Sequence, residues 1–264
     1  MGKGQVSIFV IAGILIVLLS SVAIFYARQS PQQQVLDPTR PDAIRAVVDS
    51  CHRDLLTQGI QWIGLHGGRI LPVAPSLFLD RNVLKDVQGA SIPEFALQND
   101  FLAARYLYDN GIIYQQGVDP MEQDLQAFID QRFDDCVNNF QDFRNIGMGI
   151  EQGDRQVTVS ISPDSVTSEM ALAITAKAAD SVITIDASEM TVASKLGSIW
   201  EDMVKTLVED MDKDPDFIPN QLMFEKAQEL GVQAGAIPYT TNYVYYIIDD
   251  NEVPLTFIFA QGRP

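Results

Sequence analysis

The longest predominantly apolar segment spans residues 6–27, VSIFVIAGILIVLLSSVAIFYA, and it carries no charged residue. At about 1.5 Å of rise per residue, a helix of this length reaches roughly 33 Å, enough to cross a hydrocarbon core of about 30 Å. A cleaved secretory signal has a shorter apolar region, of about 7 to 15 residues. The run therefore predicts a transmembrane anchor over residues 1–28, held in the lipid bilayer through residues 6–27.

Charge does little to orient this anchor, because Lys3 precedes the apolar run and Arg28 follows it directly. The short lead before the run suits a cytoplasmic amino terminus with the bulk of the chain translocated. Residues 29–40 are polar, contain proline and lack periodicity, which is typical of a linker. We therefore expect a single-pass membrane protein whose residues 41–264 form an extracytoplasmic domain.

Four later segments place apolar residues at three- and four-residue steps, the period of an amphipathic helix. These segments are residues 41–65, 119–140, 194–212 and 219–230. The first ends at His66-Gly67-Gly68. The second opens with a predicted cap in which Asp119 caps the helix, Pro120 starts its first turn and Glu122 returns a hydrogen bond to the cap.

Between residues 146 and 192 the pattern changes to alternation, which predicts a meander of three or four strands. A hairpin is predicted across Asp109-Asn110-Gly111, and two strands, residues 243–248 and 255–260, close the chain. Clustered helices and antiparallel strands without a βαβ rhythm indicate an α+β fold. A weak boundary near residue 140 would divide it into two subdomains.

The amino-acid composition of the chain is strongly acidic. The chain has 35 acidic and 18 basic residues, a net charge of -17, and 47% hydrophobic residues, which is ample for a core. A carboxylate-rich surface repels itself at low salt and is screened at high salt, so halophily and an ordinary acidic surface both stay open. Nucleic acid is excluded as a natural partner.

Cys51 and Cys136 each fall on the apolar stripe of their predicted helices. In a translocated domain a disulfide between the two helices is favoured, and a pair of buried thiols is the alternative. A zinc site would need more ligands at short spacing than these cysteines, His52 and His66 provide.

Signals for catalysis are weak throughout the chain. Cys51 and His52 are helix neighbours that point about 100° apart, so they cannot by themselves form a nucleophile and base pair. His66 precedes a Gly-Gly turn, and no nucleophile-elbow sequence accompanies it. We predict no catalytic residue and no cofactor.

One acidic segment invites comparison with a calcium loop. Asp210, Asp212, Asp214 and Asp216 alternate as the first positions of such a loop do, but Pro215 stands where glycine is needed and Gln221 replaces the final glutamate. These aspartates are a weak metal candidate at most. The run of Tyr239, Tyr243, Tyr245 and Tyr246 suits a binding surface, but the alternating faces of a strand explain it more simply.

The amino terminus carries a recognisable motif. Lys3-Gly4-Gln5-Val6-Ser7 followed by an apolar run resembles archaeal pilins and flagellins, in which a dedicated peptidase cuts after the small residue that follows a basic one. The resemblance implies processing between Gly4 and Gln5, which would leave Gln5 as the first residue. Where many archaeal pilins place an acid two residues after the serine, this chain has Phe9.

A second resemblance covers most of the remaining chain. It rests on six short motifs in order: Ser50-Cys51, Gly64-Leu65-His66-Gly67-Gly68, Asp135-Cys136-Val137-Asn138-Asn139-Phe140, Leu196-Gly197-Ser198-Ile199-Trp200, Asp214-Pro215 and the tyrosine-rich strand ending in Phe257-Ile258-Phe259-Ala260. In these motifs and their order, the chain is similar to a family of singly anchored proteins of small-genome archaea with no assigned activity. The resemblance implies a compartment, a topology and an architectural role for the two cysteines, and the acidic composition fits a halophilic member.

These observations predict a membrane-anchored archaeal cell-envelope protein with a non-catalytic binding or assembly role. Its expected partner is another envelope protein or a second copy of itself. The alternatives are a processed type IV pilin-like subunit and an envelope hydrolase, which would need His52 or His66 in a cleft beside a nucleophile or carboxylate.

Overall fold

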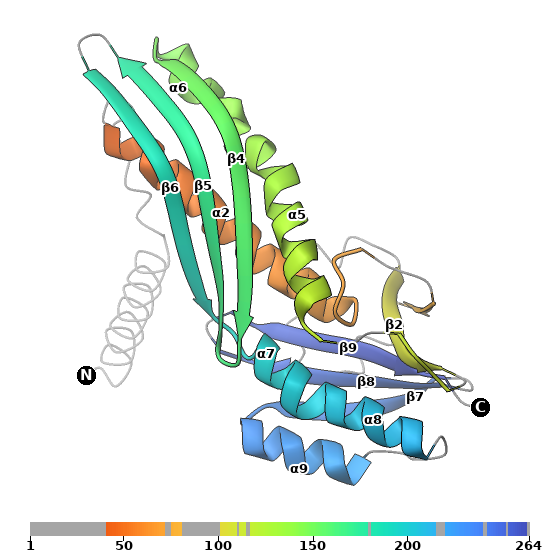
Figure 1. Ribbon diagram of the computed structural model, residues 1–264. Coiled ribbons are helices and arrows are strands. Elements are labelled where there is room, and N and C mark those ends of the chain that lie inside the picture. Colours follow the sequence, from red (N-terminus) through yellow and green to blue (C-terminus); the bar gives the residue numbers. More distant parts are fainter. Residues whose placement is uncertain are drawn as a thin grey trace, which may run out of the picture. The chain divides into compact units, whose positions relative to one another are not determined.

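The computed structural model of the 264-residue chain describes residues 41–71, 75–80, 101–109, 111–114, 117–178, 181–214, 220–239, 242–251 and 253–262. They form helices and two β-sheets, one antiparallel and one mixed, so the fold is α+β as predicted (Figure 1). The chain divides into two compact units, Met1–Ala43 and Ile44–Pro264, and the architecture below concerns the second. Among the described residues, no helix combines the length and apolar character of a membrane span, and residues 6–27 lie outside them.

The antiparallel sheet is the predicted meander, built from three long strands. They are β4 Gly149–Ser162, β5 Ser165–Ala178 and β6 Ser181–Ala193, in that order. Alternation along the strands buries apolar side chains such as Met170 and Ile185 on one face and leaves mainly polar and small side chains on the other. Both ladders shift register near their middle, where a bulge bends and twists the sheet.

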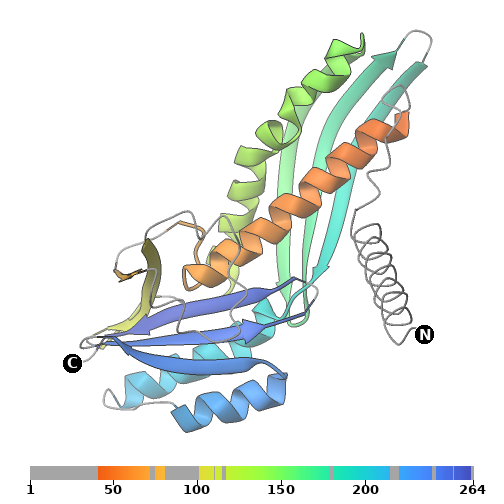
Figure 2. The same cartoon turned by 180° about the vertical axis from the view of Figure 1, so that it is seen from behind.

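Two helices cover the buried face of this sheet, α2 Pro41–Leu65 and α5 Asp119–Cys136 (Figure 2). The side chain of His52 in α2 reaches β5 and β6, and α5 packs along β4. The helices pack closely, because a Cβ on Gly59 would stand 2.6 Å from Leu125 Cδ2. Their bounds confirm the predicted first helix and shorten the second, which ends at Cys136.

The predicted end of the first helix is also confirmed. Gly67 and Gly68 have φ values of +63° and +93°, the left-handed conformation that ends many helices. The amide of Gly68 donates to the carbonyl oxygen of Ile63 at 2.8 Å and so satisfies part of the last turn.

The predicted cap of α5 is wrong. Val118 is its N-cap, and no side chain makes a capping hydrogen bond, because Asp119 is already inside the first turn. The Glu122 carboxylate instead accepts a hydrogen bond from the amide of Ile161 in β4 at 2.8 Å. A tertiary contact has therefore replaced the local capping box.

The second sheet has the strand order β1-β2-β9-β8-β7, with β3 paired to β2. The strands are β1 Ser76–Asp80, β2 Phe101–Asp109, β3 Ile112–Ile113, β7 Gln233–Tyr239, β8 Asn242–Asp249 and β9 Leu255–Gln261. The predicted hairpin and the two closing strands are confirmed. The expectation of purely antiparallel pairing fails, since β2 and β9 run parallel.

Helices that follow β6 cover one face of the mixed sheet. They are α7 Leu196–Ser198, a π-helical stretch Ile199–Val204, α8 Lys205–Lys213 and α9 Asn220–Leu230. The Trp200 ring lies 6.3 Å from the Phe257 ring of β9. The apolar positions expected on the helix over residues 194–212 are all buried, namely Leu196, Ile199, Trp200, Met203, Leu207 and Met211.

The carboxyl end of α2 lies against the opposite face of this sheet. Leu65 belongs to a buried cluster with residues of β1, β2, β8 and β9. A Cβ on Gly64 would stand 2.6 Å from the carbonyl oxygen of Thr256, so the helix comes close to the β9 backbone. Helix α2 thus contributes to the cores of both sheets.

Candidate functional site

A disulfide joins Cys51 of α2 to Cys136 at the end of α5, with the two Cα atoms 5.9 Å apart. This confirms the predicted pairing over the pair of free thiols. Cys51 is buried and Cys136 is exposed, so the bond runs from the core of the α2–α5 layer to its surface. It closes a separation of 85 residues and ties together the helices that cover the three-stranded sheet.

A strained turn follows directly after the disulfide. Asn138, Asn139 and Phe140 have φ values of +49°, +49° and +55°. Asparagine tolerates this region of the backbone map, whereas a bulky residue adopts it at a cost. Phe140 is fully buried and its ring lies 6.4 Å from that of Phe143, so packing holds it in place. The sequence pattern placed Phe140 on the helix stripe and did not anticipate this turn.

His52 is the centre of a buried polar network between α2 and the sheet. Its Nδ1 lies 3.0 Å from Ser188 Oγ in β6 and its Nε2 lies 2.8 Å from Ser168 Oγ in β5. The Ser188 hydroxyl donates to Asp49 Oδ1 at 2.8 Å. Because that proton is committed, Ser188 Oγ must accept from Nδ1–H, and Nε2 accepts from Ser168.

This network resembles a catalytic triad in residue types but not in arrangement. His52 and Ser168 are both 0% exposed, and Asp49 contacts the serine instead of the imidazole. Burial lowers the pKa of His52 to about 4, against the opposing effect of the Asp49 charge, so the ring is neutral at pH 7. Both hydroxyls in this group are buried, and Cys51 is held in the disulfide. The network positions α2 on the sheet.

His66 is also buried, at the end of α2. Its ring stacks on Trp62 with centroids 5.0 Å apart, and Nδ1 donates to the carbonyl oxygen of Ile70 at 2.8 Å. Burial lowers its pKa as well. Close in sequence to His66, Arg69 forms a bidentate ion pair with Asp124 of α5. Its Nε and Nη2 donate to the two carboxylate oxygens at 2.7 and 2.9 Å. No local sequence pattern indicates this pair, because the two residues lie 55 positions apart along the chain.

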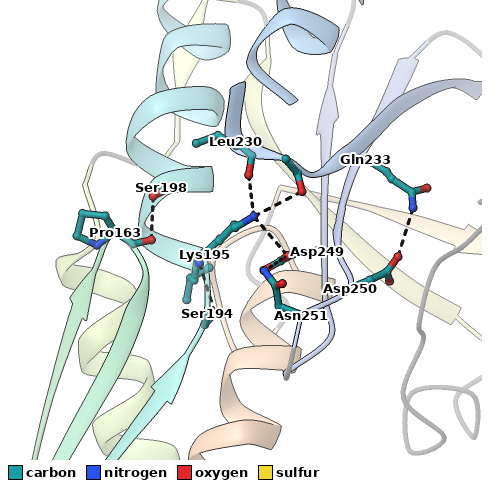
Figure 3. Close-up of polar contacts among 11 residues, drawn as sticks. Pro163, Ser194, Lys195, Ser198, Leu230, Gln233, Asp249, Asp250 and Asn251 are labelled. Atoms are coloured by element: carbon teal, nitrogen blue, oxygen red, sulfur yellow. Dashed lines mark hydrogen bonds and ion pairs between the residues drawn. The ribbon is translucent and has the colours of Figure 1, made fainter. Parts of the chain in front are cut away.

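A third polar cluster surrounds Lys195, where the chain leaves β6 (Figure 3). Its Nζ donates to the carbonyl oxygen of Leu230 at 2.7 Å and lies 3.9 Å from Asp249 Oδ1. A cation is favourable at this position, which is the carboxyl end of α9. Asp249 is 2% exposed and also accepts from Asn251 Nδ2 at 2.6 Å. These contacts hold the end of α9 and the end of β8 against Lys195, which lies just after β6.

The same region after β6 accounts for the sequence motif at residues 196–200. A Cβ on Gly197 would clash with the carbonyl oxygen of Ser162, so glycine is needed where α7 meets the β4–β5 turn. Ser198 donates from both its amide and its hydroxyl to the carbonyl oxygen of Pro163, the hydroxyl at 2.8 Å (Figure 3). Leu196-Gly197-Ser198-Ile199-Trp200 is therefore an architectural motif.

The acidic segment at the carboxyl end of α8 does not assemble into a cation site within the described residues. Asp210 pairs with Lys213 at 2.9 Å, Asp212 and Asp214 are exposed, and Asp216 lies outside the described part. No group of three or more histidine, cysteine, aspartate or glutamate residues in the described ranges is placed to hold a metal ion.

The tyrosine run divides between the two faces of β7 and β8, as strand alternation predicts. Tyr245 is buried, stacks on Phe259 with ring centroids 5.0 Å apart and donates to Gln261 Oε1 at 2.6 Å. Tyr239 and Tyr246 pack on the opposite face beside Leu65 and its cluster. These residues supply core contacts to the mixed sheet.

The expected processing site, Gly4 and Gln5, lies outside the described residues. Comparison with known proteins adds no relative to this geometry: no family model matches the chain, and neither a curated protein nor a solved structure matches it significantly.

Proposed function

We propose that the chain is a single-pass archaeal cell-envelope protein, anchored through residues 6–27, whose extracytoplasmic domain acts by binding or assembly. The observation that carries the proposal is the disulfide between Cys51 and Cys136. Such bonds form and persist outside the reducing cytosol. Together with the apolar amino-terminal run, this bond favours a domain exposed on the outer side of the membrane.

The polar clusters favour binding over hydrolysis. His52 and His66 are both buried and use ring nitrogens in contacts that hold α2 to its neighbours. Lys195 and Asp249 are likewise occupied by contacts within the fold. An envelope hydrolase would need a nucleophile and a base open to substrate, and these clusters offer neither.

Protease treatment of intact cells tests the placement. The full chain, tagged at its carboxyl end, should lose its domain to added protease without lysis, while a cytosolic marker protein stays intact. The membrane fraction should retain the chain after washing with high salt. Survival of the domain until the cells are lysed would contradict the proposal, because the domain would then face the cytosol.

A processed type IV pilin-like subunit is the second candidate, favoured by the Lys3-Gly4-Gln5 motif alone. The intact mass of the native protein distinguishes the two. A chain that begins with Gln5 supports the pilin-like subunit, whereas one that begins with Met1 supports the unprocessed anchor. Crosslinking on intact cells, followed by mass spectrometry, then identifies what the domain contacts.

A further inference from the structure

The two outer edges of the three-stranded sheet differ in what occupies them. Along β4, the Glu122 carboxylate accepts from the amide of Ile161, and Arg144 donates to the carbonyl oxygen of Ile150 at 3.5 Å. The Arg155 guanidinium is held by Asp130 and Asp134 of α5 at 2.9 and 2.8 Å. Side chains from α5 and α6 Gln141–Asn145 therefore engage the backbone and side chains of this edge.

The β6 edge carries no such cover from the described residues. Its thirteen residues pair with β5 alone, and both views show β6 as the outermost strand of its sheet (Figures 1 and 2). Among the described residues, no side chain hydrogen-bonds to its backbone, and the strand contains no proline. A long strand edge with free amide and carbonyl groups is a template for pairing with another strand.

We propose that a second copy of this chain pairs with β6, strand against strand and antiparallel, around a two-fold axis at Met190. The pairing would extend the three-stranded sheet to six strands. It deepens the assembly role proposed above by naming the partner and the surface, and it rests on that proposed function.

The side-chain pattern of β6 selects this register. Residues 187–193 alternate without interruption, with Glu189 and Thr191 on the solvent face and Ser188, Met190 and Val192 on the helix-covered face. Around a two-fold axis perpendicular to the sheet, each residue must oppose one that points to the same face, so the axis passes through a residue. An axis at Met190 pairs all seven of these residues.

Charge separates this register from the one centred on Glu189. An axis at Glu189 would set two carboxylates directly opposite each other, which destabilises a sheet, and the chain already carries a net charge of -17. An axis at Met190 places each Glu189 opposite Thr191 of the second copy. It also brings the two half-buried Met190 side chains together on the apolar face.

Anchoring in one membrane supplies the concentration that this contact needs. A single strand pair is smaller than the roughly 1,200 Å² typical of stable interfaces, so free domains would associate weakly. Two copies held in the same bilayer meet at a much higher effective concentration. The experiment therefore uses the full chain in membranes.

Cysteine crosslinking tests the register. Full chains bearing Glu189→Cys and Thr191→Cys, with different tags, are expressed together and oxidised in isolated membranes. Directly opposed residues have Cβ atoms about 4.5–5.5 Å apart and diagonal ones about 7–8 Å, so the mixed pair should crosslink about five-fold more than either variant with itself. The control is Thr158→Cys, which lies in the same row on β4 and should give only background dimer.

Equal crosslinking of all variants, or none above the Thr158→Cys level, would overturn the pairing. Peptide mapping must show that the bond between Cys51 and Cys136 is retained in each variant. Fractionation of the same cells reports separately on the proposed function: a chain that sediments with membranes but does not crosslink refutes the pairing alone, and a chain absent from the membranes refutes the anchored placement.

Discussion

The two sheets of this protein differ in the kinds of contact that join each sheet to its helices. The three-stranded sheet and its helices α2 and α5 are joined by a disulfide, the His52 network and the ion pairs of Arg155. The mixed sheet and its helices are joined mainly by apolar packing, such as that of Trp200 on Phe257, and the Lys195 cluster adds a polar link. The first layer therefore has more polar and covalent links between helix and sheet, and the second depends more on apolar packing.

This difference determines what each layer should respond to. Polar and covalent links depend on pH and on redox conditions, whereas packed apolar surface depends chiefly on shape and volume. Helix α2 belongs to both layers, through His52 at the first sheet and Gly64 at the second. Selective loss of one layer should thus be visible as different hydrogen-exchange protection at the two ends of this helix.

Removal of the disulfide should give the largest effect and confine it to one layer. A Cys51→Ser and Cys136→Ser double variant releases a link across 85 residues, for which the chain-entropy model gives about 4 to 5 kcal/mol of unfolding free energy. Denaturant unfolding measures the loss. Hydrogen exchange should show lower protection in the amino-terminal half of α2 and in α5, with β8 and β9 unchanged.

A uniform loss of protection in both sheets would contradict the layered picture, since it would mean that the whole domain unfolds as one cooperative unit. Reduction of the unchanged protein provides the matched control. It breaks the same bond without new side chains and should reproduce the pattern of exchange.

A cavity in the mixed sheet should give the complementary pattern. Phe257→Ala removes a fully buried ring from between Trp200 and Phe259 and should cost about 3 to 5 kcal/mol. Exchange should rise first in β8, β9 and α8. Phe224→Ala serves as the control, because Phe224 is 56% exposed and its loss should have a much smaller effect. Equal costs for the two substitutions would show that Phe257 is not a core residue.

The apolar periodicity of the chain predicted the helices and the meander well, because these elements depend on contacts close in sequence. The six apolar residues predicted on the helix after β6 are all buried, and the Gly67-Gly68 stop matches the positive φ values there. Strands β1 and β7 were not predicted. Strand β7 contains glycine, two alanines and a proline, a composition with little intrinsic strand preference.

The polar contacts were harder to predict, because they join residues remote along the chain. The pairing of Cys51 with Cys136 could be inferred, since two cysteines allow one intramolecular bond. No sequence pattern around Ser168 or Ser188 indicates that these serines contact His52. The position of Glu122 indicated a capping box, but its carboxylate contacts β4 instead. The parallel pairing of β2 with β9 likewise involves no local turn from which it could be predicted.

Acidification should weaken the three-stranded layer before the mixed one. Burial lowers the pKa of His52 from 6.5 to about 4 in the fold. Its contribution to the free energy of unfolding is therefore complete above pH 6.5, where His52 is neutral in both the folded and the unfolded chain. The contribution is lost as the pH falls to about 4, because the unfolded chain binds the proton first. This difference corresponds to about 3 kcal/mol of unfolding free energy.

Unfolding free energies of the natural chain and of His52→Gln, measured between pH 7 and pH 4, isolate this contribution. The variant removes the titration while it keeps an amide that can both donate and accept. It should be less stable at pH 7 but lose less stability on acidification. His66 has a lowered pKa too and contributes to the pH dependence that the two proteins share. Parallel curves for the two proteins would mean that His52 titrates normally in the fold.

Salt should give the smallest effect and should act on the two layers alike. The 35 acidic residues, against 18 basic ones, are spread between Asp37 and Glu252, so screening relieves repulsion in both layers. Exposed ion pairs on the helices that follow β6, such as Lys205 with Glu201 and Lys226 with Glu229, are weakened by the same screening, but pairs of this kind contribute little to stability. The Debye length falls from about 10 Å at 0.1 M to about 3 Å at 1 M, so relief of the repulsion should prevail and raise the unfolding free energy by about 1 kcal/mol. Chemical denaturation in urea at both salt concentrations measures this change, and a decrease would show that the attractive pairs outweigh the acidic excess.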